Sequence, residues 1–166
     1  KGLKKVFGET EVLHGISFTV ESGKALGLLG RNGAGKTTLF QTIFNNNNSS
    51  IEINENIKIG YLSQLQGQTL NYSNTIADEF FDIGFKTYDD IKEYLEGYNF
   101  DEELLNQKIG TLSGGEKNLI QLAKISEVGA DLLLLDEPTS HLDTYSQIAL
   151  EKAIKNYKGA ILMVSH

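Results

Sequence analysis

The stretch GRNGAGKTT at residues 30–38 decides the fold that this chain can adopt. It follows the short apolar run ALGLL at residues 25–29 and satisfies the pattern G-x-x-x-x-G-K-[ST], whose glycines let backbone N–H groups converge on an anion at the start of a helix. In this pattern Lys36 reaches the β- and γ-phosphates of a nucleotide, and the Thr37 hydroxyl ligates Mg²⁺. The alternative is a glycine-rich turn without a ligand, which the strand–loop–helix context disfavours.

Composition restricts the class of protein. The 166 residues suit one domain and include no cysteine, which excludes a disulfide framework and a cysteine zinc site and predicts a reducing, cytoplasmic environment. With 15 basic and 22 acidic residues the net charge is −7, so we expect no broad nucleic-acid-binding face and no direct contact with DNA. No apolar run reaches the roughly 18 residues of a membrane helix. The only methionine is Met163, which predicts a fragment of a longer chain.

Hydrophobic patterns in the first half predict strands around one helix. Apolar and polar residues alternate over residues 12–20, which predicts a half-buried strand, and the continuous run at 25–29 predicts a strand buried on both faces of a parallel sheet. A helix should follow over about residues 35–44. Renewed alternation over residues 51–62 predicts another strand or a hairpin.

The second half is predicted to hold more helix. Short, polar-studded segments between residues 65 and 110 indicate a small helical lobe, and strands alternate with helices after it, which implies a mainly parallel sheet. The predicted elements are short helices at 75–81, 89–95 and 102–107, a longer helix opened by Ser113, a strand at 132–135, a helix at about 144–157 and a strand at 160–164.

Two carboxylates follow the apolar strand in LLLLDE, residues 132–137. The carboxyl end of a parallel strand is the edge at which such sheets bind ligands. In a chain with a phosphate loop, Asp136 is expected to hold Mg²⁺ directly or through water, and Glu137 to orient or deprotonate the attacking water. Gln64 is a single polar residue after a predicted strand and on its own would be interpreted as a surface residue. Its position after a strand in a chain with a phosphate loop makes it a candidate site residue.

The sequence LSGGE at residues 112–116 has two compatible interpretations. Ser113 and Glu116 have the spacing of a capping box, which satisfies the N–H groups at a helix start. The paired glycines, Gly114 and Gly115, also offer backbone that an anion can approach closely. A capping box alone would not need both glycines, so a second phosphate contact stays open.

These motifs together resemble the nucleotide-binding domain of an ABC ATPase. GRNGAGKTT is similar to Walker A, LSGGE to the ABC signature, and LLLLDE to Walker B with its catalytic glutamate. Residues 140–143, SHLD, are similar to the D-loop. The resemblance implies an α/β fold, with a P-loop NTPase core and mainly parallel sheet, an antiparallel β flank and a small helical lobe. It assigns residues 1–166 to one cassette, with the lobe at about 65–127.

The resemblance also assigns roles within an ATP site. Catalytic roles fall to Glu137, to His166 as the switch histidine and to Gln64 of the Q-loop. Metal binding falls to Thr37, Gln64 and Asp136, with ATP and Mg²⁺ as cofactors. Nucleotide contacts are implied for Phe7, which would stack on adenine, and for Asn32, Gly33, Ala34, Gly35, Lys36, Thr37, Thr38, Ser113, Gly114, Gly115, Glu116 and Asp143.

The finer resemblance is to the ABC-F group, soluble proteins with two cassettes that act on ribosomes, some of which confer antibiotic resistance. LSGGEK at 112–117 and DEPTSHLD at 136–143 carry it, with Ser140 and Leu119 as departures. It implies a cytoplasmic ATPase that pairs head to tail with a second cassette, in tandem or as a homodimer, and reaches the ribosome through regions outside this chain. One alternative is the ATPase cassette of a membrane ABC transporter, which would need a membrane subunit. Another is a DNA-repair ATPase of related build, which would carry a coiled-coil insertion, whereas this sequence has no sustained heptads.

Overall fold

The computed structural model describes residues 3–7, 10–16, 21–29, 35–45, 53, 56–63, 70–140 and 142–165. The chain divides into two compact units. The first comprises residues 1–63, 130–138 and 158–166, and the second comprises residues 64–129 and 139–157. The assignment of residues 1–166 to one cassette, with a helical lobe at about 65–127, stays a prediction.

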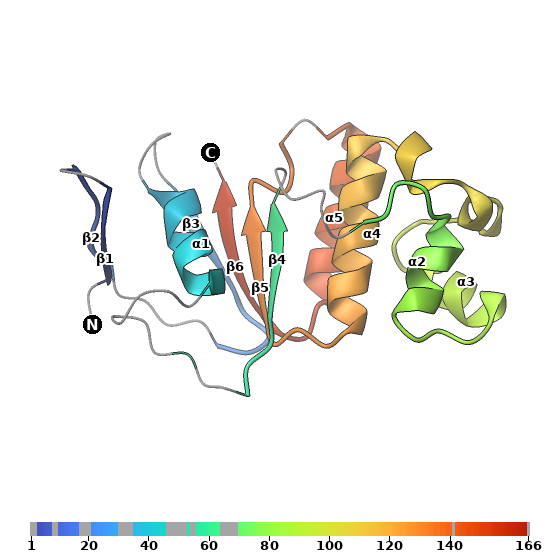
Figure 1. The fold of residues 1–166 in the computed structure, drawn as a ribbon, viewed down its shortest axis with the longest axis horizontal. Coiled ribbons are helices and arrows are strands. Elements are labelled where there is room, and N and C mark those ends of the chain that lie inside the picture. The colour runs from blue at the N-terminus through green and yellow to red at the C-terminus, as the bar shows by residue number, and fades with distance from the viewer. Residues whose placement is uncertain are drawn as a thin grey trace. The chain divides into compact units, whose positions relative to one another are not determined.

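The first unit contains a parallel sheet with the strand order β3-β6-β5-β4 (Figure 1). Every pair of neighbouring strands in it is parallel. Parallel neighbours require crossover connections, which is what the alternating apolar runs and helical segments predicted. The strands are β3 (Ala25–Leu29), β4 (Ile59–Ser63), β5 (Leu132–Asp136) and β6 (Ala160–Ser165).

Helix α1 (Lys36–Asn45) packs on this sheet through one apolar face. Burying a side chain the size of leucine or phenylalanine contributes about 1.5–3 kcal/mol, so this contact fixes the helix that begins at the phosphate loop. The buried cluster consists of Leu39, Phe40 and Ile43 of the helix with Tyr61, Leu134, Leu162 and Val164 of the sheet.

Strand β3 is less buried than its sequence predicted. Its exposure alternates along the strand, and Leu29 is 79% exposed. The reason is that only one face of β3 is packed: Leu26 and Leu28 contact the buried cluster around α1, whereas Leu29 lies on the opposite, exposed face. A continuous apolar run therefore does not by itself distinguish a strand that is covered on both faces from one that is covered on a single face.

A two-stranded antiparallel sheet precedes the parallel one in the chain. Strand β1 (Leu3–Phe7) pairs with β2 (Thr10–Ile16), and Phe7 lies opposite Thr10. The predicted antiparallel flank is thus confirmed, as is the α/β fold class with its parallel sheet.

The second unit is helical. It contains α2 (Ile76–Asp82), α3 (Tyr88–Glu96), the 3₁₀ helices η2 (Glu102–Asn106) and η3 (Ile109–Thr111), α4 (Gly114–Glu127) and α5 (Thr144–Asn156). The segment predicted as a helix at 102–107 is thus a short 3₁₀ helix. Each of the four α-helices in this unit begins after a Thr, Ser or Asp whose side chain accepts a hydrogen bond from the first turn, and α4 runs beside α5 (Figure 1).

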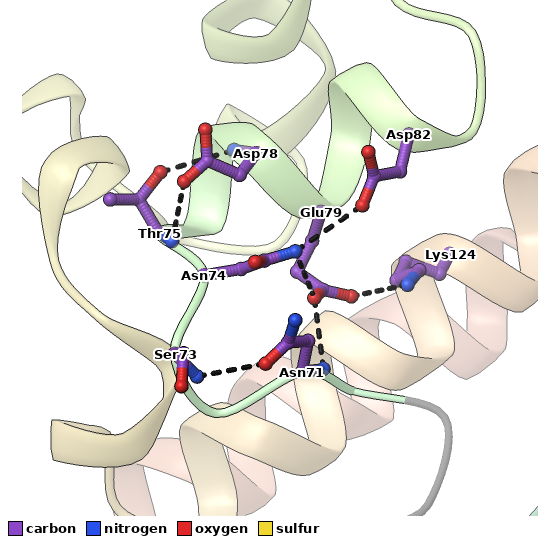
Figure 2. A network of polar contacts seen from close by, with 8 residues as sticks. All are labelled: Asn71, Ser73, Asn74, Thr75, Asp78, Glu79, Asp82 and Lys124. Carbon is purple, nitrogen blue, oxygen red and sulfur yellow. Dashed lines mark hydrogen bonds and ion pairs between the residues drawn. The ribbon is translucent and has the colours of Figure 1, made fainter.

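A buried ion pair joins two of these helices (Figure 2). Glu79 of α2 is 2% exposed, and its carboxylate pairs with the Lys124 ammonium of α4. The same carboxylate accepts hydrogen bonds from the backbone N–H of Asn71 at 2.9 Å and from Nδ2 of Asn74 at 3.0 Å. A buried charge needs such partners, because an unpaired one carries a large desolvation penalty. The network therefore holds α4 against the segment that leads into α2.

No helix in the described part of the chain is long and apolar enough to cross a membrane.

Candidate functional site

The carboxyl ends of the parallel strands meet at one edge of the sheet (Figure 1). Leu29 at the end of β3 pairs with Ser165 of β6. Asp136 at the end of β5 pairs with Val164 of β6 on one side and with Ser63 of β4 on the other. This register aligns the strand that leads into the phosphate loop with the strand that ends in the two carboxylates, at the edge where parallel sheets bind ligands.

The start of α1 has the properties of an anion-binding site. Gly35 has φ of +80°, a conformation that glycine adopts without the steric penalty that other residues incur. The first hydrogen bond of the helix runs from the N–H of Leu39 to the carbonyl of Gly35 at 2.9 Å. The first turn contains no acidic residue, so no carboxylate of the helix competes for its positive end. Lys36, Thr37 and Thr38 are half-buried there.

Asp136 has one satisfied oxygen and one unsatisfied oxygen. The side chain is 7% exposed, and its Oδ2 accepts a hydrogen bond from the Tyr61 hydroxyl at 3.2 Å. Its Oδ1 is buried and has no hydrogen-bond partner in the described part of the protein. A buried acceptor without a partner costs about 1–3 kcal/mol, and a cation at this point would remove that cost.

The surroundings of Asp136 suit a Mg²⁺ ion that is also bound by phosphate and water, and not a metal site built from protein ligands alone. Among the described residues, no group of three or more His, Cys, Asp or Glu could hold a metal ion. Mg²⁺ typically binds one or two carboxylates together with phosphate oxygens and water. One buried carboxylate whose Oδ1 has no partner among the described residues, at the sheet edge where β3 ends, matches that donor set.

Glu137 follows Asp136 in a strained conformation. Its φ is +52°, which is uncommon for a residue with a Cβ, and its N–H donates to the carbonyl of Val164 at 3.0 Å. The hydrogen bond extends the pairing with β6 by one residue and holds the chain in this conformation. Strained backbone of this kind clusters at functional sites because it fixes a side chain in a set direction.

In the second unit, LSGGE forms the predicted capping box at the start of α4. The N–H of Ser113 donates to the Glu116 carboxylate at 2.7 Å, and the N–H of Glu116 donates to the Ser113 hydroxyl at 3.2 Å. This pair satisfies two N–H groups of the helix start by itself, so the glycines between them need a separate explanation.

The two glycines differ in their surroundings. A Cβ built on Gly115 would clash with Ser146 of α5, whose Cβ would lie only 2.6 Å away. No atom of the described residues lies within 4 Å of a Cβ built on Gly114. Packing of α4 on α5 therefore explains Gly115, whereas nothing within the described structure explains Gly114. An open backbone at this point suits the close approach of a ligand from outside the chain.

Asp143 caps α5. Its carboxylate accepts hydrogen bonds from the backbone N–H and from the hydroxyl of Ser146, both at 2.9 Å. These hydrogen bonds, led by the one from the Ser146 backbone, lower the pKa of the Asp143 carboxyl below its usual value. The same Ser146 packs against Gly115, so the signature and the D-loop segment meet at this serine.

Several predicted site residues lie outside the described residues or are described only in their backbone. Outside are Asn32, Gly33, Ala34, Gln64 and His166. Phe7 is the last residue of β1, and only its backbone is described. Their roles stay predictions.

Tyr61 belongs to the site, although no motif in the sequence marks it. Its hydroxyl bonds to Asp136, 75 positions later in the chain. Two features of the sequence are relevant to this contact: the alternating pattern that predicts a strand containing Tyr61, and the carboxylate at the end of another apolar strand. Neither shows that these two strands are neighbours, which only the strand order reveals.

Comparison with known proteins defines the class. A family model described as ABC transporter matches residues 13–140, and the chain belongs to that family. It is an ABC ATPase cassette, and the α/β core, the phosphate-loop helix and the signature helix described above are the parts of such a cassette.

Comparison with individual relatives narrows the group within this family. The chain is 33% identical over 173 residues to the energy-dependent translational throttle protein EttA of Escherichia coli strain K12, an alignment that covers 99% of this chain and 31% of EttA. It is 34% identical over 160 residues to the probable ATP-binding protein YheS of Haemophilus influenzae, covering 94% of this chain and 25% of YheS. The chain thus spans a third or less of these relatives. The predicted relation to the ABC-F group is confirmed.

Solved structures agree with the fold. A putative ABC transporter ATP-binding protein from Pyrococcus furiosus superimposes with a TM-score of 0.76 at 26% identity, covering 98% of this chain and 88% of that one. The ATP-binding subunit of an ABC transporter superimposes with a TM-score of 0.73 at 21% identity and covers 100% of this chain and 78% of that one, which supports the fold alone.

Proposed function

We propose that this cassette binds ATP with Mg²⁺ and that the protein containing it uses ATP hydrolysis to act on the ribosome. The observation that carries the nucleotide site is the buried Asp136 carboxylate at the sheet edge that β3 shares, because its Oδ1 has no hydrogen-bond partner among the residues that the structure describes. The ribosomal part rests on the resemblance to a translational throttle protein over almost the whole chain.

Four described residues, Lys36, Thr37, Asp136 and Glu137, have roles in the proposed reaction. Lys36 and the N–H groups at the start of α1 bind the β- and γ-phosphates, and Thr37 and Asp136 hold Mg²⁺. When bound, Mg²⁺ offsets the negative charge that builds up on the phosphate oxygens. Glu137 orients the attacking water and accepts its proton as the water attacks the γ-phosphorus in line with the leaving oxygen.

A complete ATP site needs two cassettes, each of which supplies its signature residues to the nucleotide that the other binds. In this proposal, Ser113 and Gly114 approach the nucleotide bound by a partner cassette, arranged head to tail in tandem or as a homodimer. The open backbone at Gly114 supports it, because packing within the chain does not explain that glycine. Phe7, Gln64, Asp143 and His166 complete the proposed site as in the ABC ATPase family.

The ribosome contact is assigned to regions outside residues 1–166, because this chain has a net charge of −7 and ribosomal RNA repels acidic surfaces. A protein acting there works in the cytoplasm. Antibiotic resistance through ribosome protection is one form that this action could take.

The test uses the full-length protein with Glu137→Gln, together with the equivalent change in any second cassette. Glutamine keeps the size of the side chain but cannot accept the proton, so the ATP-bound state should accumulate. We expect this variant to co-sediment with ribosomes in ATP and Mg²⁺ and to be released without ATP. The control adds Lys36→Ala, which removes a cation from the phosphate site and should abolish the trapping.

The outcome separates the two function classes. Ribosome fractions that contain the trapped protein support the translation role. Trapped protein found only in membranes, with empty ribosome fractions, would favour the alternative, a transporter cassette with a membrane subunit. Equal ATP affinity of the Lys36→Ala variant and its parent would refute the nucleotide site itself.

A further inference from the structure

Tyr61 and Asp136 form a diagonal pair across two neighbouring strands. Tyr61 of β4 is in register with Leu134 of β5, and Asp136 lies two residues further along β5, on the same face of the sheet. The Tyr61 hydroxyl spans this diagonal and donates to Oδ2 of Asp136 at 3.2 Å. Both residues are 7% exposed, so water does not compete freely for this hydrogen bond.

The tyrosine ring is fixed by the helix that begins at the phosphate loop. Phe40 of α1 contacts the ring edge to face, with the ring centroids 6.2 Å apart. Phe44, one helical turn later, contacts it with the centroids 5.4 Å apart. Tyr61 thus lies in the interface between α1 and β5, and its hydroxyl position depends on both.

We propose that Tyr61 is a positioning residue for the metal-binding carboxylate. A carboxylate on a free side chain presents two equivalent oxygens, and its plane rotates easily. Donation from Tyr61 engages Oδ2 and leaves Oδ1 as the oxygen for the cation, which matches the unsatisfied Oδ1 in the structure. Hydrogen bonds of this kind to metal ligands orient them, and their loss typically costs about 10–100-fold in metal affinity.

Because α1 also carries Lys36 and Thr37, the same tyrosine ties the phosphate-binding helix to the metal-binding strand. Packing of Phe40 and Phe44 sets the ring, and the ring sets Asp136. This inference rests on the proposed function, since it assumes that Asp136 holds Mg²⁺.

The test compares the full-length protein with its Tyr61→Phe variant, in which the ring contacts remain and the hydroxyl is lost. ATP affinity is measured by calorimetry in EDTA and then over a Mg²⁺ titration at fixed ATP. We expect equal affinity in EDTA, a Mg²⁺ midpoint about tenfold higher in the variant, and recovery of the parent's affinity and turnover at saturating Mg²⁺.

Tyr94→Phe is the matched control. Its hydroxyl donates to the carbonyl of Ala123 at 2.8 Å in the second unit, so the variant loses a half-buried tyrosine hydrogen bond without touching Asp136. Its Mg²⁺ midpoint should equal that of the parent.

The possible results distinguish the two proposals. A parent protein whose ATP affinity does not depend on Mg²⁺ would refute the proposed metal site. A Mg²⁺-dependent parent with the same midpoint in Tyr61→Phe would refute the positioning role alone. If Tyr61→Phe instead lowered both the melting temperature and the ATP affinity in EDTA, with no separate Mg²⁺ effect, the hydroxyl would be structural and the inference overturned.

Discussion

Removing one partner of the ion pair between Glu79 and Lys124 should destabilise the helical unit. Replacing Lys124 with methionine keeps most of the side chain's apolar length but leaves the Glu79 carboxylate 2% exposed, with hydrogen bonds from Asn71 and Asn74. Breaking a buried pair on one side costs about 3–5 kcal/mol. Because the Lys124 side chain is itself 17% exposed, water can partly replace it, and we expect the lower end, about 3 kcal/mol.

Urea unfolding followed by circular dichroism gives the free energy of unfolding, provided that the slope with urea concentration is unchanged. The double variant Glu79→Gln with Lys124→Met contains no buried charge and should recover to within about 1 kcal/mol of the parent. The control is Lys92→Met. It removes the ion pair with Glu102 at 2.6 Å, in which both side chains are well exposed, and should cost under about 1 kcal/mol.

Two results would contradict this account. One is a Lys124→Met variant as stable as Lys92→Met, which would mean that Glu79 is adequately satisfied without its cation. The other is a double variant whose loss equals the sum of the two single losses, because residues that interact directly should not be additive.

Two further predictions concern the signature and the D-loop segment. Gly115→Ala places a Cβ against Ser146 and should lower the melting temperature, whereas Gly114→Ala meets open space and should leave it unchanged while weakening ATP-dependent association with a partner cassette; equal melting temperatures for the two variants would refute the packing explanation. In the folded protein, hydrogen bonds to the carboxylates of Asp143 and Asp78 lower the pKa of each below that of aspartate in the unfolded chain, which is about 3.9. The stability that these two carboxylates contribute is therefore present above about pH 3.9 and is lost as the pH falls through the lower pKa values of the folded protein. Asp143→Asn should flatten this acid limb in a pH series of melting curves, and an unchanged limb would show that the carboxylate contributes nothing.

Local chemistry in the sequence predicted the local parts of the site. The capping box at Ser113 and Glu116 depends on residues three apart, and the structure forms it as expected. The strand that ends in Asp136 was predicted because four leucines precede two carboxylates within six positions. Both patterns are complete within a single turn or strand, so no knowledge of the tertiary structure was needed.

Contacts between segments that lie far apart in the chain could not be predicted from the sequence. The reason for Gly115 lies in Ser146, 31 positions away, and the partner of Asp136 lies in a strand that the chain visits much earlier. The strained φ of Glu137 was equally hidden, because glutamate is not a residue type that favours a positive φ. Pairing order and helix packing create these features, and neither can be read from spacing along the chain.

Because the parallel strands end at one edge of the sheet, β5 should tolerate substitutions of its leucines better than changes in its length. If the residues before it kept their pairing, a single-residue deletion within β5 would move Asp136 into the position that Leu135 now occupies, on the opposite face of the sheet and away from the Tyr61 hydroxyl. Replacing one buried leucine of β5 with another aliphatic residue would leave that geometry in place. The length of β5 itself is fixed by the carboxylate at its end.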